Sequence, residues 1–185
     1  MQTQQFQSQR ALAAAVAVFS EGVAGSAPSE ILSDGLGLIQ HQCSADQVTL
    51  YSAHQHEVIP LGTSPVEEMP TGACPTDWFP WGFSVAAPER FLFVQNAETL
   101  PVALGSSQTL GELGLHSCLH LPILERQQLI GALQLYWSAP QEEWDDSTGQ
   151  ILRSLGRLLL ASSTGEESVP YRNPPQGVRP YSSLA

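Results

Sequence analysis

The stretch that decides the fold runs from Gly114 to Trp137 and reads GLHSCLHLPILERQQLIGALQLYW. Apolar residues recur at alternate positions on both sides of ERQ, which is the pattern of two half-buried strands joined by a turn. We therefore expect a β-hairpin whose turn lies at Glu125–Gln127. Every second side chain of a strand lies on the same face of its sheet. The hairpin therefore predicts that His116, Cys118 and His120 share one face.

Three histidine and cysteine residues in this pattern could bind a metal, supply a reactive thiol or line a pocket. Same-face neighbours on a strand lie about 6–7 Å apart, so they converge poorly on one ion. No spacing in the chain meets the usual zinc templates, although His41, Cys43, His54 and His56 are further candidate ligands. A cysteine within a strand usually behaves as a small apolar residue. We therefore expect buried or pocket-lining residues here, with no metal and no catalytic residue.

Composition excludes several classes of partner. The chain has 185 residues and a net charge of −11, with seven arginines and no lysine. Such a charge repels nucleic-acid phosphates and anionic lipid surfaces. The expected partners are therefore small molecules or proteins.

Cysteine content and hydropathy bear on location. Cys43, Cys74 and Cys118 form no CxxC pair, which favours free thiols in a reducing compartment such as the cytoplasm. The longest apolar run, Ala11–Phe19, is too short to cross a bilayer. Residues 1–27 loosely fit a cleaved signal peptide, although Gln-rich sequence precedes the apolar run.

The first third of the chain predicts two helices and a hairpin. Apolar residues recur at three- and four-residue steps over Gln5–Val23 and again over Ser29–Gln42. Ser26 is the expected N-cap of the second helix, with proline tolerated just after it. Alternation then predicts a hairpin from Val48 to Leu61, with Pro60 marking an edge or an end of its second strand.

The middle and end of the chain differ in regularity. Residues 63–90 carry five prolines and form a long loop. A strand at Arg90–Asn96 and a helix at Pro101–Leu113 follow it. WDDSTGQILRSLGRLLLAS (144–162) is the clearest helix, with Asp145 or Asp146 as its cap. Residues 164–185 are expected to be a flexible tail.

Three segments resemble the GAF domain family. CSADQVTLYSAH (43–54) is similar to the family's first strand, and the Gly114–Trp137 hairpin is similar to its central hairpin, with Gly131 opening the second strand. SAPQEEWDDSTGQILRSLGRLLL (138–160) is similar to the closing helix, with Trp144 at the usual aromatic position. The resemblance extends from about Leu12 to Ala161 and leaves residues 63–90 without a strong match.

The resemblance implies an α+β fold over residues 1–163, an α/β/α sandwich. Its antiparallel sheet has about five to six strands, a usual size for a sheet, with helices on both faces. The first and last helices are expected to pack together and to form a homodimer interface. The other face of the sheet and its loops are expected to form a small-molecule pocket. Family ligands include cyclic nucleotides, bilins, haem and metabolites, and the sequence names no cofactor among them.

Two family activities use cysteine and fit this chain poorly. Free methionine sulfoxide reductases use a set of pocket cysteines, and only Cys74 and Cys118 fall in the corresponding part of this chain, without the surrounding motif. In such an enzyme Cys74 and Cys118 must come within disulfide range. Bilin-binding members carry a cysteine followed by histidine, whereas Leu119 follows Cys118 here.

Two further groups of residues are candidate contacts. Aromatic residues gather within the long loop and are expected to form a lid or wall of the pocket, or a docking patch: Trp78, Phe79, Trp81 and Phe83. The tail carries two proline-tyrosine pairs with nearby arginines, and an extended proline-rich segment suits a protein partner. The partner-binding candidates in the tail are Tyr171, Arg172, Arg179 and Tyr181.

Taken together, the residues and the resemblance lead to one hypothesis with two alternatives. We expect a non-enzymatic regulatory module that acts through protein contact and is gated by a small molecule. The first alternative is a ligand-free docking or assembly factor. The second is a thiol redox enzyme of the free methionine sulfoxide reductase type.

Overall fold

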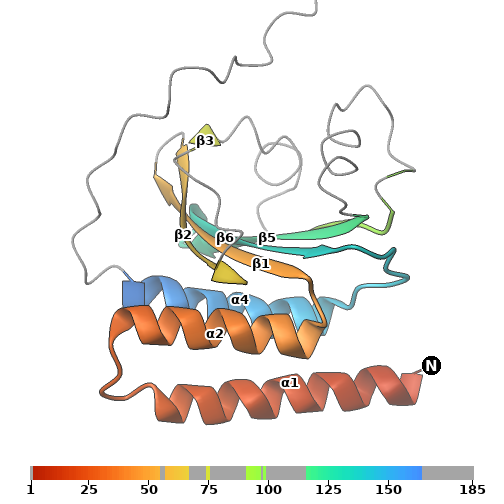
Figure 1. The fold of residues 1–185 in the computed structure, drawn as a ribbon, viewed down its shortest axis with the longest axis horizontal. Coiled ribbons are helices and arrows are strands. Elements are labelled where there is room, and N and C mark those ends of the chain that lie inside the picture. The colour runs from red at the N-terminus through yellow and green to blue at the C-terminus, as the bar shows by residue number, and fades with distance from the viewer. Residues whose placement is uncertain are drawn as a thin grey trace, which may run out of the picture.

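Residues 2–54, 57–66, 74–75, 91–96, 98 and 116–163 are described by a computed structural model of the chain. They form one antiparallel sheet of six strands in the order β3-β2-β1-β6-β5-β4, together with three helices (Figure 1). The elements in chain order are α1 (Gln2–Gly22), α2 (Pro28–Cys43), β1 (Gln47–His54), β2 (Glu57–Ser64), β3 (Cys74–Pro75), β4 (Leu92–Val94), β5 (Ser117–Glu125), β6 (Gln128–Trp137) and α4 (Asp146–Ser163). The expected α+β fold is confirmed.

The three described helices lie on one side of the sheet, with α2 and α4 against the strands and α1 beyond them (Figure 1). The main hydrophobic core fills the space between this helix pair and the sheet. The helix expected over residues 101–113 lies outside the described residues. The same holds for most of the 63–90 loop and for the tail.

Helix α1 packs through the apolar stripe that the sequence predicts. Leu12 is buried, and Val16, Phe19 and Val23 pack half-buried against the core. The first and last helices contact each other, as expected from the resemblance. Helix α1 is therefore attached along one stripe, and its opposite side is exposed.

The start of α2 corrects one expectation. Ala27, not Ser26, occupies the N-cap position, and Pro28 follows at the first helical position. The backbone N–H of Ala27 donates to Glu30 Oε2 at 3.2 Å. Glu30 thus supplies only the glutamate half of a capping box, and the N-cap residue itself makes no side-chain hydrogen bond.

Strand β2 corrects half of a second expectation, because Pro60 does not end the strand. Strand β3 pairs only with Glu57 and Val58 of β2, so among the described residues Pro60 has a neighbouring strand on its β1 side alone, as expected for an edge position. The register against β1 shifts between Leu50, which pairs with Gly62, and Tyr51, which pairs with Pro60. Leu61, which has no partner in this register, is the extra residue of a β-bulge next to Pro60. The strand therefore continues to Ser64.

The hairpin β5–β6 and helix α4 form where the sequence predicts them. The turn lies at Arg126–Gln127, within the predicted range. Asp145 caps α4 by accepting from the backbone N–H of Thr148 at 2.9 Å and from its hydroxyl at 3.0 Å. Strands β5 and β6 of this hairpin carry residues of the candidate site described below.

Candidate functional site

The two faces of the sheet differ in chemistry. Leu50, Leu119 and Leu133 belong to the core beneath the helices and are fully buried. Their strand neighbours point to the opposite face, because side chains alternate along a strand. That face carries polar side chains that are buried as well.

Four of these polar residues form a continuous line across neighbouring strands, here called the polar row: Thr63, Thr49, Gln134 and His120. Thr63 pairs with Thr49 between β2 and β1, and Thr49 pairs with Gln134 between β1 and β6. Gln134 in turn pairs with His120 between β6 and β5. Each residue of the row is at most 7% exposed.

The two halves of the polar row are internally hydrogen-bonded. Thr63 donates its hydroxyl to the carbonyl oxygen of Val48 at 2.9 Å, so at the 2.9 Å contact between the threonine hydroxyls Thr49 is the donor. In the other half, the Tyr136 hydroxyl donates to Gln134 Oε1, and Gln134 Nε2 contacts His120 Nδ1, both at 2.9 Å. These hydrogen bonds therefore have defined directions, with each threonine hydroxyl and the tyrosine hydroxyl donating to one named acceptor.

His120 is held as a neutral ring. An amide nitrogen only donates, so Nδ1 of His120 is the acceptor and the ring proton resides on Nε2. Burial lowers the pKa of His120 to about 4, because the charged form loses its hydration. The ring of Tyr136 stands edge-on to it, with ring centroids 6.2 Å apart. The polar row thus offers oriented dipoles and no charge near neutral pH.

Cys118 lies on the same face as His120, one row further along β5, as the sequence predicts. Burial raises the pKa of its thiol to about 12, and its side chain is 1% exposed. Nucleophilic cysteines need a thiolate, which this thiol does not form near neutral pH. Burial raises the pKa of Cys43 to about 12 as well.

The cysteines do not form the pair that a thiol redox enzyme of the expected type needs. Cys74 belongs to β3 and Cys118 to β5, with β2, β1 and β6 between them. Four strand spacings separate their backbones by about 19 Å, beyond the roughly 7 Å that a disulfide spans between Cα atoms. The condition that the thiol redox alternative sets for this pair is therefore not met.

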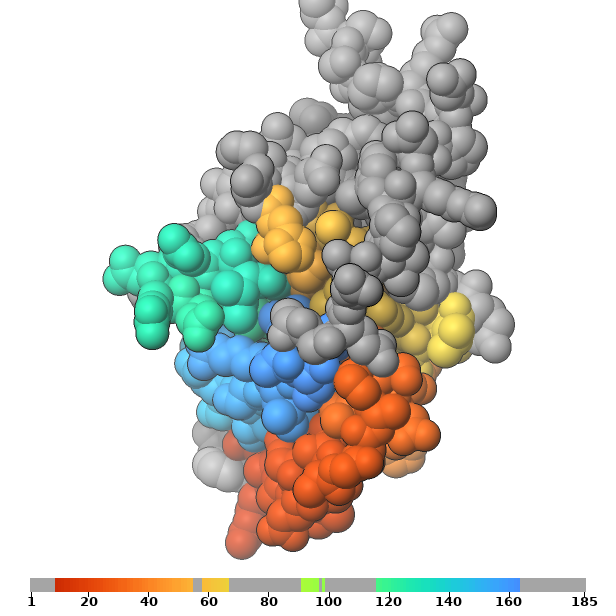
Figure 2. Space-filling view, turned by 90° about the vertical axis from the view of Figure 1, so that its left-hand side faces the viewer, coloured from red at the N-terminus to blue at the C-terminus, as the bar shows by residue number. Residues whose placement is uncertain are grey.

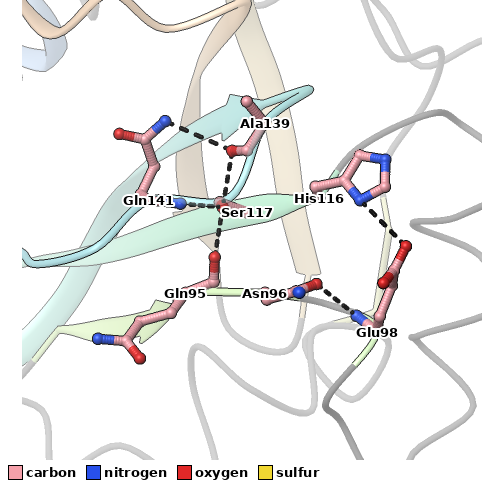
Figure 3. A network of polar contacts seen from close by, with 7 residues as sticks. All are labelled: Gln95, Asn96, Glu98, His116, Ser117, Ala139 and Gln141. Carbon is pink, nitrogen blue, oxygen red and sulfur yellow. Dashed lines mark hydrogen bonds and ion pairs between the residues drawn. The ribbon is translucent and has the colours of Figure 1, made fainter.

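His116 lies four residues before His120, at the N-terminal end of β5, and its backbone N–H donates to the carbonyl oxygen of Trp137. It precedes β5 at the end of the hairpin, with a side chain 36% exposed and its Nδ1 3.6 Å from Glu98 Oε1 (Figure 3). The side chain of the neighbouring Ser117 lies on the opposite face of the sheet from Cys118, because side chains alternate along a strand. Its hydroxyl contacts the carbonyl oxygens of Gln95 and Ala139 at 2.6 and 2.9 Å, and it accepts from the backbone of Gln141 at 2.9 Å. His116 and Ser117 therefore belong to the sheet's end and join β4, β5 and the segment before α4.

No group of three or more histidine, cysteine, aspartate or glutamate residues in the described part of the chain is placed to hold a metal ion. Several sequence candidates lie outside the described residues: Trp78, Phe79, Trp81, Phe83, Tyr171, Arg172, Arg179 and Tyr181.

Sequence reasoning missed most of the polar row. Thr49 alternates with Val48 and Leu50, and Gln134 alternates with Leu133 and Leu135. That alternation was a usable signal for the face each side chain takes. Which of these residues meet across strands depends on register, which the sequence pattern does not give.

Comparison with known proteins identifies the family. The sequence model of the GAF domain matches residues 27–161, well over half of the chain. The chain belongs to the GAF domain family, a family of regulatory and ligand-binding modules. Helix α1 precedes the matched range. A search of curated proteins found no match.

Solved structures share the fold at low sequence identity. The GAF domain of a phosphoenolpyruvate-protein phosphotransferase from Coxiella burnetii has a TM-score of 0.62 at 16% identity, covering 85% of this chain and 95% of that one. JSC1_58120g3 with bound biliverdin IXa has a TM-score of 0.61 at 14% identity, covering 82% and 96%. Free methionine-R-sulfoxide reductase from Neisseria meningitidis, in complex with its substrate, has a TM-score of 0.56 at 14% identity, covering 79% and 84%. Proteins with this fold thus differ in activity, so the function of this chain has to be argued from the residues of its candidate site.

None of the helices within the described residues combines the length and hydropathy that crossing a bilayer requires.

Proposed function

We propose that this chain is a non-enzymatic regulatory module that binds a small molecule at the polar row and passes the signal on by protein contact. The observation that carries the proposal is the line of four buried polar side chains on the sheet face opposite the helices. Ligand sites are typically apolar hollows with a few fixed polar groups, and Val58, Ala132 and Cys118 are buried apolar neighbours on this face.

The polar row is costly as a purely structural feature. Burying a hydroxyl or an amide loses hydration that its new hydrogen bonds only partly replace. The leucine-rich core beneath α2 and α4 already supplies the apolar burial that folding needs. A polar line on the other face is better explained by recognition, because strands hold such groups rigidly in place.

The character of the polar row restricts the ligand. Burial lowers the pKa of His120 to about 4, so its ring is neutral near pH 7, and the other three members of the row do not titrate. Recognition would therefore rely on hydrogen bonds and shape and would not require an opposite net charge. A planar or compact organic molecule with both donors and acceptors fits this description.

The positions of the three cysteines do not support the thiol redox alternative. Cys118 is buried with a raised pKa, and Cys43 lies in α2 on the opposite side of the sheet. Cys74 is separated from Cys118 by three strands. Thiol redox catalysis by a cysteine pair is therefore not our proposal for this chain.

The second candidate function is a ligand-free docking or assembly factor. It is favoured by one observation, namely that the groups of the polar row already satisfy one another. Such a module would act through its surface, including a homodimer formed by α1 and α4. Val18 of α1 is 71% exposed and would take part in such a contact. Free thiols at Cys43 and Cys118 agree with a cytoplasmic setting for either candidate.

Native mass spectrometry of the protein purified gently from its own source, together with an absorption spectrum, distinguishes the candidates. A bound small molecule of defined mass supports the regulatory proposal. A bare monomer or dimer, or a chain carrying only a co-purified protein, supports docking and contradicts ligand binding. Size-exclusion chromatography with light scattering on the same sample measures whether the homodimer forms.

A further inference from the structure

Basic residues are unevenly placed in this acidic chain. The described residues contain four arginines, and the chain has no lysine. Arg10 lies alone in α1. The other three, here called the basic flank, lie in the β5–β6 turn and along α4: Arg126, Arg153 and Arg157. Most of the positive charge in the described residues therefore belongs to one region.

Packing between α4 and β5 brings the basic flank together. The Arg157 guanidinium donates to the carbonyl oxygen of Leu124 at 3.0 Å, two residues before Arg126. Gly156 lies directly against Ile123, so the helix approaches this end of the strand closely. Arg153 precedes Arg157 by one helical turn, about 6 Å along the same side. Figure 2 shows the hairpin tip standing out from the surface beside α4.

The turn that presents Arg126 is conformationally unusual. Arg126 and Gln127 have φ angles of 48° and 67°, the left-handed region that two-residue hairpin turns normally fill with asparagine and glycine. Arg126 and Gln127 are also exposed, so core packing does not explain the choice of residues. Strain held at a surface position is a reason to look for a function there.

Arg153 is incompletely paired. It is half-buried, and its Nη2 atom is buried without a hydrogen-bond partner. Burial lowers the pKa of Arg153 and the charge of Arg157 lowers it further, while Asp146 opposes them. Glu125, the last residue of β5 and the chain neighbour of Arg126, is a second acidic residue beside the flank and is exposed. An arginine side chain has several rotatable bonds, so it can turn toward an incoming acceptor without a backbone change.

We propose that the basic flank docks an acidic segment of a partner protein. Guanidinium groups bind carboxylates in paired hydrogen bonds, and the unpaired nitrogen of Arg153 lacks such an acceptor. The three arginines extend from the hairpin tip along a helix, which suits a peptide with several spaced carboxylates better than one compact anion. The chain has a net charge of −11, and within the described residues the flank is where arginines gather, so we expect an acidic segment to bind there. This surface lies on the helix side of the sheet and does not depend on a ligand at the polar row.

Fluorescence anisotropy with a labelled octaglutamate peptide tests the docking surface on the whole chain. We expect saturable binding at low salt despite the net charge of the protein, and weaker binding as salt rises. Arg126→Gln and Arg153→Gln should each weaken binding by about threefold, the usual scale for exposed ion pairs. Arg10→Gln is the matched control, because it removes one positive charge from α1, and it should leave binding unchanged.

Other outcomes overturn the proposal. Absence of binding at low salt contradicts it, as does an equal loss of binding in Arg10→Gln, which would indicate a net-charge effect. Inorganic phosphate or anionic phosphatidylserine vesicles that bind through the same arginines more tightly than the peptide would assign the flank to a small anion or to a membrane. Thermal unfolding of each variant verifies that the fold is intact.

Discussion

Gly131 of β6 lies so close to the backbone of Tyr51 in β1 that no side chain fits between them. A Cβ added to Gly131 would be 2.4 Å from the carbonyl oxygen of Tyr51 and 2.8 Å from Cδ1 of Leu160. The obstacle on the β1 side is backbone, which cannot swing away. This contact joins the two central strands that carry Thr49 and Gln134, so the polar row depends on it.

Gly131→Ala should therefore destabilise the protein by about 3 kcal/mol, the upper end of the usual cost of overpacking. The measurement is the free energy of unfolding from urea denaturation. An unchanged free energy of unfolding would mean that β1 and β6 separate without penalty, and the close approach would then have no structural role.

Gly37 provides the opposite prediction within the helical layer. It lies inside α2, and a Cβ built there meets nothing within 4 Å. Gly37→Ala should raise the free energy of unfolding by about 0.5–1 kcal/mol, because alanine favours the helix more than glycine does. Gly35→Ala in the same helix serves as its contrast, since that Cβ would be 2.4 Å from Leu159. A gain in both variants would contradict the packing between α2 and α4.

The buried His120 predicts a pH dependence of stability. Its pKa is about 4 in the folded protein and 6.5 in the unfolded chain, so below pH 6.5 the unfolded chain takes up the proton first. Stability from this residue is complete above pH 6.5 and is lost as pH falls toward 4, by about 3 kcal/mol in all. Urea denaturation across this range should show a shallower pH dependence in His120→Gln than in the wild type. Equal slopes would mean that the folded protein protonates His120 readily.

Gln134 links Tyr136 to His120, and its loss should be costly. Gln134→Met keeps the approximate shape of the side chain but leaves the Tyr136 hydroxyl and His120 Nδ1 without this partner. We expect a loss of about 2 kcal/mol in the free energy of unfolding. Gln150→Met on the exposed side of α4 is the matched control and should have little effect. If the two variants lose the same stability, the amide of Gln134 does not connect the row.

Cys118 should be chemically inert in the folded protein. Its burial and its pKa of about 12 leave almost no accessible thiolate at pH 8. Iodoacetamide labelling followed by peptide mass mapping should modify Cys118 only after unfolding in urea. Labelling at similar rates in folded and unfolded protein would show that the Cys118 thiol is accessible and reactive in the folded state, which contradicts this prediction.

Local patterns were sufficient for the elements with strong periodicity. The β5–β6 hairpin and its turn follow from the alternation between Ser117 and Trp137, and α4 follows from its leucine stripe and the Asp145 cap. These signals are contained within each element. These elements could therefore be predicted without knowing their contacts with the rest of the chain.

Features that depend on contacts between elements were not predictable in this way. The bulge at Leu61, next to Pro60 in β2, exists only because β2 pairs with β1. The face of His120 followed from alternation, but its partner Gln134 follows from strand register. That His116 shares a face with Cys118 and His120 stays a prediction, because His116 directly precedes the first residue of β5.

The measurement that tests the central claim most directly is ligand retention by native mass spectrometry in matched variants. Protein isolated from its source should carry a small molecule of constant mass. Thr49→Val should lose that molecule while remaining folded, since the variant keeps the side-chain volume and removes only the hydroxyl. His116→Ala, which lies outside the polar row, should retain it. Wild-type protein without any bound molecule, or equal retention in Thr49→Val and His116→Ala, would contradict the assignment of the polar row as a ligand site.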